Sequence, residues 1–124
     1  WSMLLPDGSP RQLTSYDDNV GFVHWLQDGS GMIFGKAKGG DENTQFYWMD
    51  KNGVHVRALT DEPGVRHDFG AISRDSDQIY YSSNKRKRQF FDIYSLICLG
   101  LIYGTMQLIF LNMYTSIQKL QDWV

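Results

Sequence analysis

The sequence has little of several features that would narrow its class at once. Its 124 residues include 1 cysteine, Cys98, so no internal disulfide can form and a disulfide-stapled secreted fold is excluded. The net charge is only −2, so no overall field attracts nucleic acid. No basic stretch followed by an apolar one opens the chain, so we expect no signal peptide, and a start at Trp1 fits a piece of a longer protein. The compartment stays open, with the cytoplasm favoured over the periplasm.

Motifs that carry chemistry are also missing from the sequence. No G-x-S-x-G nucleophile elbow occurs, and the Gly70–Ser73 stretch lacks the required spacing to a second glycine. His24, His55 and His67 are far apart, and with one cysteine they do not supply converging metal ligands. No phosphate-binding G-x-x-x-x-G-K-[ST] segment is present. We therefore predict no catalytic residues, no metal site and no cofactor, and we do not expect this chain to be an enzyme by itself.

Aromatic residues and glycines, in contrast, are plentiful, and they fall into a repeat. Aromatics make up 15% of the chain and 12 glycines punctuate it, which is typical of short strands joined by tight turns. Similar segments recur at spacings of 46 or 47 residues, in this order: 11–20 with 57–65, 25–34 with 72–81, 46–50 with 93–97, and Gly53 with Gly100. A period near this length is typical of a four-stranded propeller blade.

One repeat unit can be divided into four strands. The segments at 20–26, 31–37, 44–50 and 54–60 are predicted strands, joined by hairpin turns at Asp28-Gly29 and Asn52-Gly53 and by a polar glycine loop. The predicted fold is therefore all-β, an incomplete β-propeller of about two and a half four-stranded antiparallel blades. Its expected parts are the end of a blade at 1–14, a complete blade at 15–60, a second blade at 61–107 whose pattern is lost after residue 96, and an uncertain apolar tail at 108–124.

The repeat resembles those of a known family. The segments "HWLQDGSGMIF", "GGDENTQFYWMDKNG", "RALTDEPGVRHDFGAIS" and "DIYSL" are similar to propeller repeats of prolyl oligopeptidase-type serine peptidases, in particular dipeptidyl aminopeptidases and acylaminoacyl peptidases. The resemblance implies a non-catalytic propeller that restricts which peptides reach an α/β-hydrolase domain outside this chain. Its partners would be that domain, the remaining blades and, through the parent protein, a peptide. The alternative is a TolB-like propeller that binds or scaffolds, with no hydrolase attached.

Four residues are candidates for contact with a peptide. Asp41 and Glu42 lie in the glycine loop, which in the family lines the cavity that faces the active site, although a solvated turn is the commoner state of such a loop. Arg66 and His67 open the next unit and could present charge at a channel mouth, or simply form an exposed strand entry. The basic run 85–88 occupies the place of the glycine loop one repeat later, so we expect a solvated inter-strand loop there and no nucleic-acid binding.

The end of the chain loses its charge, with no charged residue from Ile93 to Gln118. A small membrane-anchored protein is the least favoured interpretation, because 93–96 already form a repeat strand and the remainder contains Gly, Gln, Asn and Thr. A strand over 101–111 or a terminal helix are the alternatives. Because an incomplete propeller leaves apolar faces bare, we expect self-association. We also expect Trp25 to be buried in the core.

Overall fold

A computed structural model describes residues 1–97, and the predictions for the fourth strand of the second unit and for the apolar tail lie outside these residues. The described part contains seven strands and no helix, which confirms the all-β prediction, and none of its segments is a helix that could cross a membrane. One sheet has the order β1-β2-β3-β4 and the other the order β5-β6-β7, all neighbours antiparallel and neither sheet closed. The strands are β1 (Val20–Trp25), β2 (Gly31–Lys36), β3 (Gln45–Asp50), β4 (Val56–Ala58), β5 (His67–Ile72), β6 (Gln78–Lys87) and β7 (Phe90–Ile97).

The two predicted hairpin turns of the first sheet are confirmed. Gly29 and Gly53 have φ of 71° and 73°, a conformation that glycine adopts without steric cost. Asp28 Oδ1 accepts hydrogen bonds from the amide and hydroxyl of Ser30, at 2.9 and 2.7 Å, and so fixes the first turn. Asp50 Oδ1 accepts hydrogen bonds from two amides of the second turn, each at 2.8 Å. Local turn chemistry therefore sets where each strand reverses.

Ser76 shows how the second sheet makes the same turn without glycine. It stands 47 residues after Gly29 and has φ of 59°, which is uncommon for a residue with a Cβ. Its side chain is buried, and its Oγ accepts a hydrogen bond of 3.0 Å from the amide of Gln27, in the turn of the first sheet. The hydroxyl that replaces the glycine thus joins the two sheets.

The two sheets share one pairing register at an offset of 47 residues. Met32 pairs with Met49 as Ile79 pairs with Leu96, and Ile33 pairs with Trp48 as Tyr80 pairs with Ser95. The first strands differ in detail, because β1 has its irregularity at Gly21 and β5 has its irregularity at Gly70. The sequence repeat is therefore a structural repeat as far as the described residues extend.

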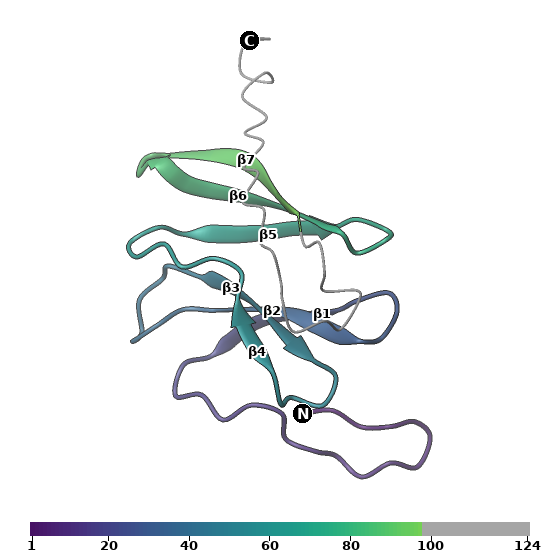
Figure 1. Ribbon diagram of the computed structural model, residues 1–124. Coiled ribbons are helices and arrows are strands. Elements are labelled where there is room, and N and C mark those ends of the chain that lie inside the picture. The colour runs from purple at the N-terminus through teal and green to yellow at the C-terminus, as the bar shows by residue number, and fades with distance from the viewer. Residues whose placement is uncertain (98–124) are drawn as a thin grey trace.

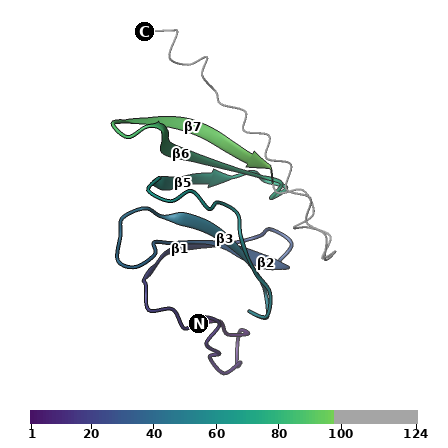
Figure 2. The same cartoon turned by 60° about the vertical axis from the view of Figure 1, so that its left-hand side comes forward.

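The sheets stack face to face, with sheet β5-β6-β7 lying over sheet β1-β2-β3-β4 in both views of the molecule (Figures 1 and 2). The shared core between them consists of Leu26, Ile33, Phe46, Trp48 and Leu59 from the first unit and Ile79, Tyr81, Tyr94 and Leu96 from the second. Phe46 is central, with ring centroids 5.3 Å from Tyr81 and 5.6 Å from Phe22. Gly35 makes room for Phe22, since a Cβ there would come within 2.2 Å of that ring. Phe46 and Trp48 are therefore both core residues.

The opposite face of the first sheet carries a second, smaller apolar cluster. Met32, Phe34 and Met49 are buried there, with Leu13 packed against them. The prediction that Trp25 is buried is wrong, because Trp25 pairs with Met32 and so lies on this outer face, where it is 50% exposed. Leu13 stands 46 residues before Leu59. Leu13 packs on this outer cluster, and Leu59 is buried in the core between the sheets.

The basic run is not the open loop that the repeat alignment predicts. Lys85 to Lys87 continue β6, and Lys87 pairs with Phe90 across a short turn. Lys85 Nζ lies 4.0 Å from the centroid of the Tyr94 ring, and Arg86 Nη2 donates a hydrogen bond of 2.9 Å to Asp92 Oδ1. Contacts with β7 therefore extend the hairpin through residues that the sequence pattern assigns to a loop.

Candidate functional site

Two adjoining hollows lie where the first strands of the two sheets, β1 and β5, come together. Among the described strands, β1 and β5 are each an edge strand of their own sheet. One hollow, of about 340 Å³, is lined in part by Asp41, Glu42 and Arg66, three of the four predicted contact residues. The other, of about 520 Å³, is lined in part by the fourth, His67. Both are bordered by Gly21 and Thr44, so they form one depression, here called the edge groove.

The glycine loop on the rim of the groove is held by Asp18, which the sequence reasoning missed. The carboxylate of Asp18 accepts hydrogen bonds of 3.1 Å from the amides of both Gly39 and Gly40. Both glycines have positive φ, of 65° and 75°, which turns their amides toward one acceptor. Lys36 Nζ lies 3.9 Å from Asp18 Oδ2. The only sequence feature that could have indicated this role of Asp18 is the Gly39-Gly40 pair, because the amides of such a loop need a hydrogen-bond acceptor.

Asp41 and Glu42 are both exposed at the tip of this loop, but they differ in how far they are already engaged. The carboxylate of Asp41 accepts hydrogen bonds from the amide and side chain of Asn43, at 3.0 and 3.2 Å. These bonds, led by that from the side chain, lower the pKa of Asp41, so it is ionised well below neutral pH. Among residues 1–97 no side chain or amide is seen to bind the carboxylate of Glu42, which leaves it the more available of the two.

Arg66 lies across the groove from the loop and is fixed at both its main chain and its side chain. Its amide donates a hydrogen bond of 2.9 Å to Asn84 Oδ1 in β6. Its Nε donates a hydrogen bond of 2.9 Å to Asp68 Oδ1, and both side chains remain more than 40% exposed, at 46% and 44%. A pair this exposed contributes little to stability. It does place a guanidinium at the groove in a defined orientation.

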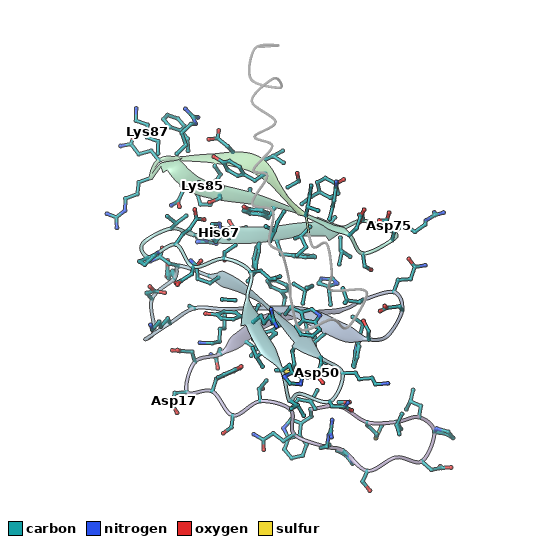
Figure 3. All side chains as sticks on the ribbon, viewed as in Figure 1. Asp17, Asp50, His67, Asp75, Lys85 and Lys87 are labelled. Atoms are coloured by element: carbon teal, nitrogen blue, oxygen red, sulfur yellow. The ribbon has the colours of Figure 1, made fainter. Side chains whose placement is uncertain are left out.

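His67 is a core residue, which differs from the exposed strand entry expected of it. Its side chain is 0% exposed, lying between the sheets with ring centroids 5.6 Å from Phe46 and 5.3 Å from Tyr81 (Figure 3). Burial, and then the positive charge of Lys85, lowers the pKa of His67 to about 4, so the ring is neutral at neutral pH. Glu62 Oε2 lies 3.0 Å from Nε2 of His67, but neither atom has a hydrogen-bond partner. Burial of the ring therefore determines the direction in which the pKa of His67 shifts. His67 packs in the core beneath the groove and contributes no charge to it at neutral pH.

Aromatic rings form the second hollow, and the sequence reasoning did not bring them together. The His24 ring stacks on Phe69 with centroids 4.5 Å apart and planes 21° apart. Phe22 lies 4.7 Å from the same Phe69 ring, and the two phenylalanines stand 47 residues apart in the chain. Contacts between sheets create this cluster, so no local pattern could reveal it.

The groove is lined by groups that can bind a ligand. Within residues 1–97 no three His, Cys, Asp or Glu side chains converge as ligands for a metal ion. The groove offers an aromatic wall, a carboxylate, a guanidinium and the outer edges of two strands, whose amides and carbonyls can bond an extended chain. No protein-family model matches the chain, and no curated protein matches it either.

Proposed function

We propose that this chain is part of the non-catalytic propeller domain of a prolyl oligopeptidase-like serine peptidase, where it limits which peptides reach a hydrolase domain outside these residues. The observation that carries the proposal is the common register of the two sheets at an offset of 47 residues, together with their face-to-face stacking. A propeller is built from such sheets repeated radially, so two stacked sheets of one register support the proposal. The remaining blades and the hydrolase domain are its partners in the parent protein.

In this proposal the edge groove faces the central channel. It lies where the first strands of successive sheets meet, and the sheets of a propeller are arranged around such a channel. A peptide passing the groove meets Glu42 and Arg66 on one side and the His24–Phe69 stack on the other. Opposite charges and aromatic rings at a constriction select among peptides by their side chains, while the bond is cleaved elsewhere.

Two measurements test the proposal. The purified chain should not hydrolyse acyl-peptide or dipeptide reporter substrates, and turnover that a serine-directed inhibitor blocks in a pure preparation would overturn the non-catalytic assignment. In ¹⁵N spectra, unstructured octapeptides should shift the amide signals of Gly21 and Gly70 at the groove. Arg66→Gln should weaken the shifts several-fold, whereas the matched control Lys51→Gln, away from the groove, should leave them unchanged.

The coding sequence that adjoins this chain would distinguish the peptidase hypothesis from the hypothesis of a binding module. A downstream G-x-S-x-G followed by an aspartate and a histidine supports the peptidase. A complete run of further repeats with no such elements would support the TolB-like alternative instead.

A further inference from the structure

The two sheets stack in the same sense, so each has an upper and a lower face that can be defined by the internal interface. The upper face is the one that the first sheet turns toward the second, and it carries Ile33 and Trp48. The lower face is the one that the second sheet turns toward the first, and it carries Ile79 and Leu96. Because the register repeats at an offset of 47 residues, the paired positions of β2 and β3 have counterparts on the same face of β6 and β7.

The upper face of the second sheet carries two exposed apolar side chains, whereas Ser95, the counterpart of Trp48, is polar and buried. Tyr80, the counterpart of Ile33, is 36% exposed, and Ile93, the counterpart of Phe46, is 51% exposed. Phe46 itself is fully buried in the internal interface, where its ring lies 5.3 Å from Tyr81. The second sheet therefore presents at its surface two of the positions that the first sheet uses for stacking, those of Ile33 and Phe46.

The lower face of the first sheet is open only in part, because Leu13 and Tyr16 pack on its buried cluster. Trp25 and Val23 are each 50% exposed, although their partners in the ladder, Met32 and Phe34, are buried. A hollow of about 150 Å³ lies beside them, lined in part by Trp25, Phe34 and Met49. Phe34 is the counterpart of Tyr81, and its ring is already covered by Tyr16, so this hollow lies beside the place that corresponds to the Phe46–Tyr81 contact of the internal interface.

We infer that a second copy of this chain docks head to tail, with the upper face of its second sheet on the lower face of the first sheet. In this contact Ile93 of one copy enters the hollow of the next and packs against Val23 and Trp25, which are exposed beside it. The inference rests on the shared register and not on the peptidase assignment. The two surfaces differ, so the contact is heterologous and leaves one face open at each end for further copies.

Sedimentation velocity on the full chain tests the inference through complementation. The parent chain should form species that grow with concentration. Trp25→Lys destroys the lower face and Ile93→Lys the upper face, so each variant alone should be a monomer. An equimolar mixture retains one intact face of each kind and should give a one-to-one dimer and nothing larger. The control Val54→Lys, at an exposed residue of the β3–β4 turn, should associate like the parent.

Three results would overturn the inference: a parent chain that is monomeric at every concentration, a single-face variant that associates as the parent does, or a mixture that stays monomeric. Circular dichroism and a thermal melt establish that each variant is folded. Where a lysine variant loses its β signal, Trp25→Thr and Ile93→Thr replace the pair, since threonine keeps strand propensity and removes the large apolar group.

Discussion

Phe46→Ala is the substitution that most directly probes the packing between the sheets. The Phe46 side chain is fully buried, and four rings surround it: Phe22, His67, Phe69 and Tyr81, at centroid distances of 5.3 to 6.2 Å. Three of its geometries, with Phe22, Phe69 and Tyr81, are edge-to-face at 77°, 81° and 86°. Three of the four rings belong to residues of the second sheet, so removing the phenyl group opens a cavity in the shared core.

The expected cost is large for a chain of this size. Phe→Ala in a core costs about 3–5 kcal/mol from lost transfer free energy and the cavity left behind. Edge-to-face pairs add about 0.5–1.5 kcal/mol each beyond burial, which places Phe46→Ala toward the upper end. Whole domains are stable by only about 5–15 kcal/mol. The variant should therefore lose half or more of its stability, and should separate the two sheets before the strands within each sheet.

Urea unfolding followed by far-UV circular dichroism measures this cost, with Phe91→Ala as the matched control. Phe91 is 44% exposed, so the control removes the same ring from a partly solvated site and should cost less than about 1 kcal/mol. Both variants are best compared in the Trp25→Lys background, which removes the contact between copies. Equal free energies of unfolding for the two variants would refute the stacked core.

The remaining predictions concern pH and the two turns. The pKa of His67 is about 4 in the folded chain against 6.5 for an ordinary histidine, so below pH 6.5 the unfolded state binds a proton that the folded state does not. Stability should fall by about 3 kcal/mol between pH 6.5 and 4 and then level off, and urea midpoints should fall less steeply in His67→Phe. Gly29→Ala should cost about 1 kcal/mol from its positive φ alone, since a Cβ there meets nothing within 4 Å. Ser76→Ala should cost about 1–2 kcal/mol through the lost hydrogen bond to Gln27. Ser76→Gly should cost less, because glycine adopts the φ of 59° without strain. Equal melting temperatures for these two variants would refute the strain at that turn.

Much of the fold could be predicted because it depends on local chemistry and on a repeat. The turns at Gly29 and Gly53 follow from residue pairs that favour positive φ, and the strands between them follow from length and composition. The side on which Trp25 lies could not be predicted. The first sheet has apolar residues on both faces, so an alternating pattern identifies the strand but not which set of side chains faces the shared core.

The candidate site was predicted in part, for a similar reason. Asp41, Glu42 and Arg66 line one hollow because the repeat places a loop and a strand entry at the same edge. Burial of His67 and stacking of His24 on Phe69 depend on how one sheet lies on the other, and no spacing within a strand reports that. The hairpin at Lys85 to Lys87 was missed because contacts with Tyr94 and Asp92 outweigh the loop-like composition of the run.

The central claim is that the two halves of the chain form two sheets of one register, stacked in the same sense, and nuclear Overhauser contacts test it most directly. Spectra should show cross-strand contacts for Ile33 with Trp48 and for Tyr80 with Ser95, and contacts between the ring protons of Phe46 and Tyr81. Magic-angle spinning makes the measurement possible for an assembly of any size. A shift of either strand pair by one residue, or the absence of the Phe46–Tyr81 contact in a folded sample, would contradict the account.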